Sequence, residues 1–186
     1  MKEEFLEIYS SSGKKTGKKA TKSHIHKKGL FHATVHVWIF SEKGNVLIQK
    51  RSTKKKLNPG VWDVSVAGHV EYKEDINVAA VRETLEETGI YIKEKDLFKL
   101  GIYTSVSDYP QIIDKEFHHT YVLKIDEVKI NLNYKNDEVD DLKLISLEEM
   151  DSLLNQNNRD IFIGKNKNYY RDVFEAISKI TRENYQ

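Results

Sequence analysis

The stretch GHVEYKEDINVAAVRETLEETGI, residues 68–90, decides the fold of this chain. It follows a short run typical of a strand and a loop, and from Asp75 to Thr88 its pattern becomes helical. Gly89 stands where a left-handed C-terminal cap is expected, so the helix is predicted to end there. The apolar residues at helical spacing are Val78, Val81 and Leu85.

Three glutamates stand in the last turns of this predicted helix. Glu83, Glu86 and Glu87 are at positions i, i+3 and i+4, so their side chains share one face. The negative end of the helix macrodipole disfavours carboxylates there, and only Arg82 lies beside them. A divalent cation would remove that conflict, and hard oxygen ligands suit magnesium or manganese. On spacing alone, a solvated acidic face is the simpler interpretation.

Composition sets the broad class of the protein. Its 186 residues suit one domain, and 39% hydrophobic with 32% charged residues is an ordinary globular balance. The sequence has no apolar run long enough to span a bilayer and no secretory signal, so we expect a cytoplasmic protein without membrane contact. Because there is no cysteine, disulfides, thiolate metal sites and thiol nucleophiles are excluded. The net charge of +1 gives no reason to expect nucleic-acid binding.

The basic stretch GKKTGKKATKSHIHKK, residues 13–28, departs from this balance. It would serve either as a lip that attracts anions or as a solvated hairpin or mobile arm. No aromatic residues interleave with its charges, which favours the second interpretation.

The rest of the chain predicts a sheet and two further helices. Strands are expected at residues 5–9, 31–40, 46–51, 61–68, 98–106, 116–125 and 142–146, with 31–51 forming a hairpin. Helices are expected at 147–155 and about 167–182, and the apolar face of the last contains Tyr170, Val173, Phe174, Ile177 and Ile180. This order predicts an α/β fold, with a mixed sheet covered by helices on both faces.

The full segment 68–90 resembles the Nudix box, Gly-x5-Glu-x7-Arg-Glu-U-x-Glu-Glu-x-Gly-U, where U is a bulky apolar residue. The fixed positions are occupied by Gly68, Glu74, Arg82, Glu83, Glu86, Glu87 and Gly89, and Ile90 fills the last apolar one. Thr84 departs at the first U position. On this resemblance the chain is identified as a single Nudix domain with an α/β/α sandwich. Residues 1–30 would be an N-terminal hairpin or extension, 31–146 the core and 147–186 the C-terminal helices.

The resemblance also implies a pyrophosphohydrolase and assigns its residues. Glu83, Glu86 and Glu87 would hold Mg²⁺ or Mn²⁺ with the carbonyl of Gly68, while Arg82 would orient the carboxylates and Glu74 would brace the loop. The metal would neutralise a diphosphate and activate a water that attacks phosphorus. Glu83 or Glu86 would polarise that water, although in this superfamily the base can come from elsewhere.

Residues 32–70 are similar to a narrower branch of the superfamily, the one that contains isopentenyl-diphosphate isomerase. The shared run is KRSTKKKLNPGVW, residues 50–62, followed by Gly-His. Arg51 and Lys55 would correspond to residues that grip the diphosphate of the substrate, a role that suits a guanidinium and an ammonium on one turn. The alternative is that these charges only solubilise a loop.

The isomerase also uses a metal site of histidines and carboxylates. His32, His69 and Glu116 match its ligand positions, Asp114 lies beside them, and His26 or His24 stands near another. Such a cluster would bind zinc or manganese. Each histidine would otherwise be a core or surface residue. Glu116 would act as a ligand of this second metal or as the base, and His69 also lies near the expected substrate.

One departure argues against isomerisation. That reaction needs a cysteine just before the Gly-His pair, where this chain has Ala67. The favoured function is therefore hydrolysis of a small-molecule diphosphate, such as a nucleotide sugar, dinucleotide, nucleoside triphosphate, thiamine diphosphate or isoprenoid diphosphate. The alternatives are an isomerase-like enzyme and a non-catalytic nucleotide sensor, and a homodimer is left open. Four aromatic residues are candidates either for ring stacking or for the core: Trp38, Trp62, Tyr103 and Phe117.

Overall fold

The computed structural model describes residues 3–155 and 166–182. Its N-terminal part contains β1 (Phe5–Tyr9), β2 (Lys15–Thr21), α1 (Lys22–Lys28), β3 (Phe31–Ser41), β4 (Val46–Arg51), β5 (Trp62–Asp63), β6 (Val66–His69) and α2 (Ile76–Thr88). The remainder contains β7 (Phe98–Tyr109), β8 (Ile112–Ile125), β9 (Val139–Ile145), α3 (Leu147–Asn155) and α4 (Lys167–Arg182), with short 3₁₀ helices η1 (Glu94–Asp96) and η2 (Glu127–Lys129).

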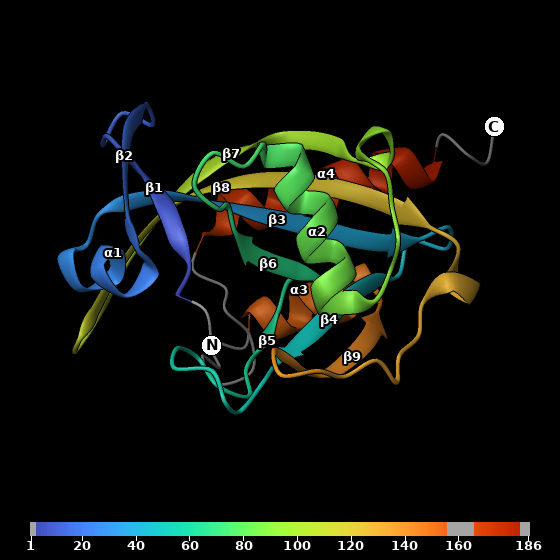
Figure 1. Cartoon of the computed structure of the whole chain (residues 1–186). Coiled ribbons are helices and arrows are strands. Elements are labelled where there is room, and N and C mark those ends of the chain that lie inside the picture. Colours follow the sequence, from blue (N-terminus) through green and yellow to red (C-terminus); the bar gives the residue numbers. More distant parts are fainter. Residues whose placement is uncertain (1–2, 156–165, 183–186) are drawn as a thin grey trace.

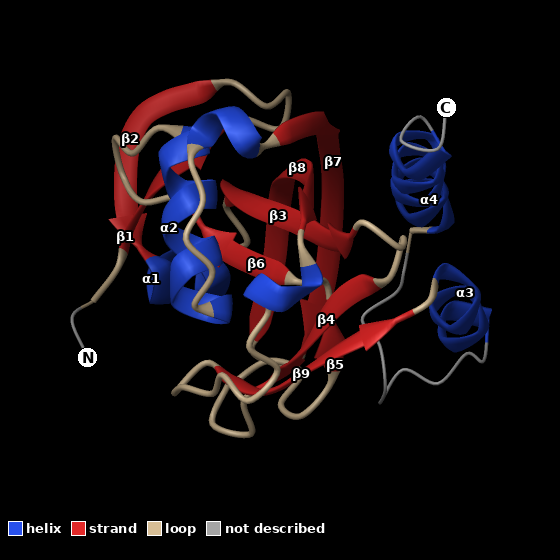
Figure 2. Cartoon of the chain, turned by 90° about the vertical axis from the view of Figure 1, so that its right-hand side faces the viewer, coloured by secondary structure: helices blue, strands red, loops and turns tan. Residues whose placement is uncertain are grey.

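The nine strands form one mixed sheet with β3 at its centre. Strand β3 pairs in parallel with β8 along its whole length, from Phe31 opposite Lys115 to Ser41 opposite Ile125. On its other side it pairs antiparallel with β6. Figures 1 and 2 show α2 on one face of the sheet and α3 and α4 on the other. The expected α/β fold, a mixed sheet covered by helices on both faces, is confirmed.

The alternation of side chains along β3 explains these layers. Val35, Val37 and Ile39 point to the α2 face, where they pack with Ala79 and Ala80. The residues between them point to the other face. There Trp38 and Phe40 pack with residues of α4, namely Tyr169, Tyr170, Val173 and Ile177. A strand buried on both faces reads as an almost continuous apolar run, which is why β3 was predictable from its sequence.

The N-terminal segment contains a hairpin and, in addition, a helix that was not predicted from the sequence. Residues 13–28 form β2, which pairs antiparallel with β1, and then α1. Thr21 caps α1 by accepting a hydrogen bond from the N–H of His24, and Gly29 ends it with φ 59°. Of the two forms that the favoured interpretation allowed, the structure shows the solvated hairpin, followed by a short helix with capping residues at both ends.

Two strand predictions need correction. The expected hairpin over residues 31–51 is reduced to one pair, Phe40 opposite Val46, because β6 and β8 occupy the two edges of β3. The strand expected over residues 61–68 is divided into β5 and β6, which pair with β4 and β3 respectively.

The three longer helices lie where they were predicted. Over residues 3–155 and 166–182, none of the helices has the length and apolar character that crossing a bilayer requires.

Candidate metal and catalytic site

Helix α2 is held at both ends by capping interactions. The side chain of Asp75 accepts hydrogen bonds from the N–H groups of Asn77 and Val78, and Gly89 follows the helix with φ 71°. The Gly89 N–H donates to the carbonyl of Leu85 over 2.9 Å. These contacts fix where the carboxylate turns begin and end.

The buried face of α2 differs from the face that the apolar spacing indicates. Val78 and Leu85 are 46% and 45% exposed. The helix instead packs through small or polar side chains: Ala79, Ala80, Glu83, Thr84, Glu87 and Thr88 are all buried. Small residues let α2 approach β3 and β6 closely, and this orientation turns two of the three glutamates inward.

Gly68 on β6 makes room for the first of these glutamates. A Cβ atom at this position would lie 2.0 Å from Cδ of Glu83, far inside van der Waals contact. Only glycine lets the carboxylate lie against the backbone of β6. The structure therefore brings together Gly68 and Glu83, which the sequence predicted to share a metal site.

The neighbouring groups only partly stabilise negative charge on the buried carboxylates Glu83 and Glu87. Burial raises the pKa of Glu83 to about 7 even though Arg82 lies beside it. Burial and then the charge of Glu83 raise the pKa of Glu87 to about 8, despite hydrogen bonds from the N–H of Ala67 at 2.8 Å and from Nε2 of Gln49 at 2.6 Å. Two such groups beside one another favour a bound cation, which would allow both to ionise.

Arg82 connects the helix, the loop and the strand. Its Nε and Nη2 donate to the two oxygens of Glu74 over 2.8 and 2.9 Å, and its Nη1 donates to Glu83 over 2.8 Å. Nη1 also reaches Glu86 at 3.0 Å, and Nη2 donates to the carbonyl of His69 at 2.9 Å. The side chain of Glu86 is 57% exposed, so it is the carboxylate of the three that faces solvent.

The two predicted diphosphate-binding residues lie in different environments. Lys55 forms an ion pair with Glu138 at 2.7 Å, and its charge lowers the pKa of Glu87, so it lies on the carboxylate side of the loop. Arg51 is paired with buried Asp63 at 3.2 Å and donates to the carbonyl of Leu57 at 3.3 Å. Its Nε is buried with no hydrogen-bond partner in the structure, which leaves one donor for a ligand.

A second cluster lies on the α3/α4 face of the sheet, beside β6. His26, His32 and His69 place ring nitrogens within 4.8 Å of one another, and His32 forms a second such group with Asp114 and Glu116. Nε2 of His32 lies 3.6 Å from Glu116 and 3.8 Å from Asp114. The structure thus brings these five side chains together from α1, β3, β6 and β8.

The second cluster contains buried polar atoms that could serve as metal ligands and that form no hydrogen bonds in the structure. Nε2 of each of the three histidines and Oδ1 of Asp114 are buried without a hydrogen-bond partner. Burial, and then the charge of Glu116, raise the pKa of Asp114 to about 7, while burial lowers the pKa of His26 to about 4. Neutral imidazoles and carboxylates with free lone pairs are suitable metal ligands. His26, rather than exposed His24, is the residue that α1 turns into the cluster.

Strand β6 lies between the two clusters. The N–H of Ala67 bonds Glu87, Gly68 lies against Glu83, and His69 offers its carbonyl to Arg82 and its ring to the histidine cluster. Because consecutive residues of one short strand contact both donor sets, the two candidate sites are adjacent.

Polar groups continue along the same face of β3 and β8. Thr34 bonds His118 at 2.8 Å, the His36 and His118 rings stack at 4.0 Å, and His36 bonds the hydroxyl of Tyr169 at 2.8 Å. Trp38 and Phe117 belong to the cores, so their rings do not face a ligand, while Trp62 and Tyr103 are half-buried.

Sequence reasoning missed Gln49 and Glu138. Gln49 donates to Glu87, and the charge of Glu138 adds to the rise of the Glu83 pKa. Neither carried a signal in the sequence, because a lone polar residue in a strand or loop does not show which helix will pack against it.

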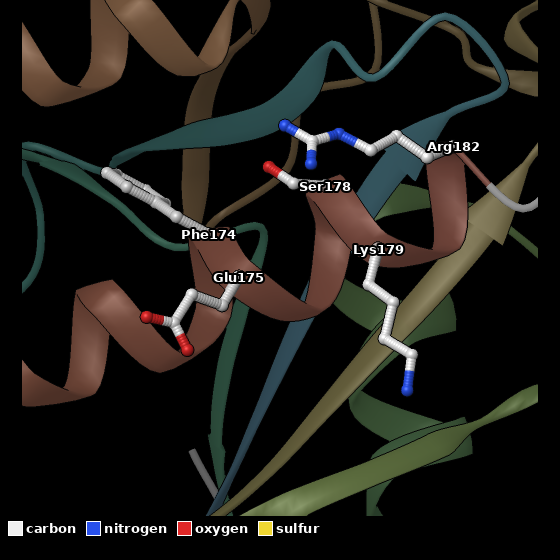
Figure 3. A pocket seen from close by; sticks show the side chains of 5 residues that line it. All are labelled: Phe174, Glu175, Ser178, Lys179 and Arg182. Atoms are coloured by element: carbon white, nitrogen blue, oxygen red, sulfur yellow. The ribbon is translucent and has the colours of Figure 1, made fainter.

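A surface hollow of about 440 Å³ lies away from these clusters, on α4. Figure 3 shows the five side chains that line it spreading outward from the helix: Phe174, Glu175, Ser178, Lys179 and Arg182. No predicted site residue lines it.

Comparison with known proteins identifies the family of this chain. Residues 30–163 match the model of the NUDIX domain family. An uncharacterised Nudix hydrolase of Clostridium acetobutylicum is 33% identical to this chain, over 95% of the chain and 98% of the relative. Isopentenyl-diphosphate Delta-isomerase 2 of Photorhabdus laumondii is 34% identical, over 73% of the chain and 74% of that protein. The resemblance to the isomerase-containing branch is thus confirmed.

Solved structures share the fold. A crystal structure from Deinococcus radiodurans superposes with a TM-score of 0.64 at 18% identity, covering 95% of this chain and 98% of that one. The family match and the hydrolase relative support a pyrophosphohydrolase enzyme. With its complete box, its sandwich fold and these matches, the chain belongs to the Nudix family.

Proposed function

We propose that this protein is a divalent-metal-dependent hydrolase that cleaves a diphosphate linkage in a small organic molecule by attack of water on phosphorus. The observation that carries the proposal is the buried pair Glu83 and Glu87, whose pKa values are raised to about 7 and about 8 where glycine leaves space beside them. A hydrolase with a metal cofactor needs such a pair, whereas a structural role does not.

The donor set fits magnesium or manganese. Glu83, Glu86, Glu87 and the carbonyl of Gly68 would hold the ion, and all four donors are hard oxygens. When bound, such a cation neutralises phosphoryl charge and lowers the pKa of a coordinated water.

The protein groups then have separate tasks. Arg82 holds Glu83 and Glu86 in place through the contacts described above. Lys55 and the free Nε–H of Arg51 would bind diphosphate oxygens. Glu83 or Glu86 would accept the proton of the attacking water, with Glu116 as the alternative base.

We also propose a second metal site in the histidine cluster. His32, His69 and Glu116 would be its main ligands, with His26 and Asp114 completing the set. The unpartnered buried nitrogens support this assignment, because burying them without a partner is costly.

Two other functions are less well supported. Isomerisation of isopentenyl diphosphate lacks its thiol, since Ala67 replaces the cysteine and the chain has none. A nucleotide sensor without turnover has no need for the intact carboxylate set. We place the enzyme in the cytoplasm as one Nudix domain, with residues 1–30 as a hairpin or extension and α3 and α4 as C-terminal helices; residues 156–165 and 183–186 of the proposed helical part lie outside the described residues.

A substrate panel tests the proposal. Nucleotide sugars, dinucleotides, nucleoside triphosphates, thiamine diphosphate and isoprenoid diphosphates are incubated with Mg²⁺, and phosphate or nucleotide release is measured. The wild type should turn over at least one class, Glu86→Gln should lose about 10²-fold or more, and exposed Glu148→Gln should remain active. Equal inertness of wild type and Glu86→Gln across the panel would remove the hydrolase assignment. Conversion of isopentenyl to dimethylallyl diphosphate would favour the isomerase instead, and saturable nucleotide binding without turnover would favour the sensor.

A further inference from the structure

Strand β7 forms one edge of the sheet, and its central part, residues 101–107, carries no charged side chain. Within the described residues it pairs with β8 alone, and Figure 1 shows it as the outer strand beside β8. It is 12 residues long and contains no proline. Ile102 and Val106 on it are 53% and 58% exposed. A long apolar edge offers unpaired backbone groups to another strand.

Strand β2, which is another edge of the sheet, shows a protection that the centre of β7 lacks. Strand β2 presents exposed Lys15, Lys18 and Lys19, with a glycine between them. Lysines on an edge oppose pairing with a second chain, because burying their charge is costly. The contrast between the two edges indicates that β7 is the one available for association.

The exposed residues of β7 follow a symmetrical order along one face. Ile102, Thr104 and Val106 lie opposite His119, Phe117 and Lys115 of β8, so they share the face that carries α2. Asp108 continues this face at one end. At the other end the register shifts between Lys99 and Gly101, so that Lys99, opposite Tyr121, is on the same face. The order is therefore Lys99, Ile102, Thr104, Val106, Asp108.

We propose that two copies of this chain associate by antiparallel pairing of their β7 strands, with a twofold axis at Thr104. Opposite residues in antiparallel strands point to the same face, so the axis places Ile102 beside Val106 of the partner subunit, twice. It also places Lys99 beside Asp108 of the partner subunit, again twice. The two β sheets then form one continuous sheet.

Charge complementarity is the reason for choosing a second copy as the partner. The bulge makes Lys99 and Leu100 share one step of the strand, so Lys99 and Asp108 are equally distant from Thr104. A strand with one cation and one anion at equal distances from its centre is complementary to itself when antiparallel. A second copy of β7 supplies this match without any further requirement.

Analytical ultracentrifugation over a concentration series tests this dimer. The wild type should sediment at twice the chain mass. The variants Ile102→Lys and Val106→Lys should be monomeric, because in a dimer each new lysine would be buried beside an apolar residue of the partner subunit. Val128→Lys is the matched control: Val128 is 86% exposed on η2, and the same change of charge there should leave the dimer intact. A monomeric wild type, or equal loss in the control, would overturn the proposal.

A charge exchange tests the register itself. Lys99→Asp and Asp108→Lys should each weaken dimerisation about tenfold, because each creates two like-charge contacts. The double variant should restore the wild-type dissociation constant. Circular dichroism should show the same thermal unfolding for all four proteins at a concentration where each is monomeric. Failure of the double variant to restore association would contradict pairing at this register, as would preferential binding of β7 to a different strand of the protein.

Discussion

At the residue scale, the absence of a Cβ atom at Gly68 leaves the space that the Glu83 carboxylate of α2 occupies. The Cβ of an alanine at position 68 would occupy the space of the Glu83 side chain. The spacing of the box made Gly68, Arg82 and the glutamates predictable, because the same residues recur at fixed steps. Gln49 was not predictable, since its role depends on which strand lies under the helix.

Gly68→Ala should therefore abolish metal-dependent hydrolysis by displacing Glu83. We expect a loss of about 10²-fold or more in kcat/KM and weaker Mg²⁺ binding in a direct titration. Gly101→Ala is the control, because the nearest atoms to a Cβ at Gly101 belong to the Tyr103 side chain and lie at 3.4 Å or more, in ordinary van der Waals contact. Full activity of Gly68→Ala with unchanged Mg²⁺ affinity would show that Glu83 is not a ligand.

The raised pKa values of Glu83 and Glu87 predict a pH dependence. Both values lie above the ordinary 4.5, at about 7 and about 8. The protonated carboxyls are favoured by folding, so their contribution to stability is full below pH 4.5 and is lost as pH rises through 7 to 8. Urea unfolding in the presence of a chelator should therefore show falling stability over this window.

Metal binding should have the opposite dependence. Ligand carboxylates must be deprotonated, so Mg²⁺ affinity should increase more than tenfold from pH 6 to pH 8. Glu87→Gln removes one of the two titrations and should flatten both curves. A variant whose unfolding curves keep the full pH dependence of the wild type would contradict the assignment to Glu87.

At the element scale, the sequence predicted where α2 lies but not which way it faces. Its bounds followed from the cap positions, which are local. Its buried face did not follow from apolar spacing, because α2 packs through Ala79 and Ala80 and leaves Val78 and Leu85 half exposed. A helix that presents carboxylates to a site cannot also present a wide apolar stripe there.

Substitutions on the two faces of α2 test which face of the helix is buried. Ala80→Leu should cost about 1–3 kcal/mol, because Ala80 is fully buried between α2 and the sheet. Leu85→Ser should change the free energy of unfolding by less than about 1 kcal/mol, since nearly half of the Leu85 side chain is already exposed. Urea titration measures both, and the reverse order of costs would mean that the helix is rotated.

The role of helix α1 depends on contacts with residues that are distant in the sequence. Thr21 and Gly29 cap it locally, yet nothing local shows that it delivers a histidine to β3 and β6. The sequence left His24 and His26 open as donors, and the structure places His26 in the cluster.

His26→Ala should therefore weaken Mn²⁺ or Zn²⁺ binding at the second site about tenfold or more by calorimetry. His24→Ala is the matched control, because His24 is exposed on the same short helix. Equal affinities of the two variants and the wild type would remove His26 from the ligand set.

At the scale of the whole molecule, the layers were predictable and the strand order was not. Strands followed by helices imply a mixed sheet covered on both faces. The parallel pairing of β3 with β8 joins segments about eighty residues apart, and only the folded chain shows that it aligns His32 with Glu116 and Thr34 with His118. This register, together with β6, places the two candidate metal sites side by side.

Attack of water on phosphorus at the α2 carboxylates would leave an isotopic label in the product. The best substrate of the panel is therefore turned over with Mg²⁺ in ¹⁸O-labelled water, and the products are analysed by mass spectrometry. We expect one ¹⁸O in a phosphoryl group of the product, and no label when Mg²⁺ is removed or Glu83 is changed to Gln. Label in the organic alcohol instead, or the same labelled product from Glu83→Gln at the wild-type rate, would contradict this mechanism.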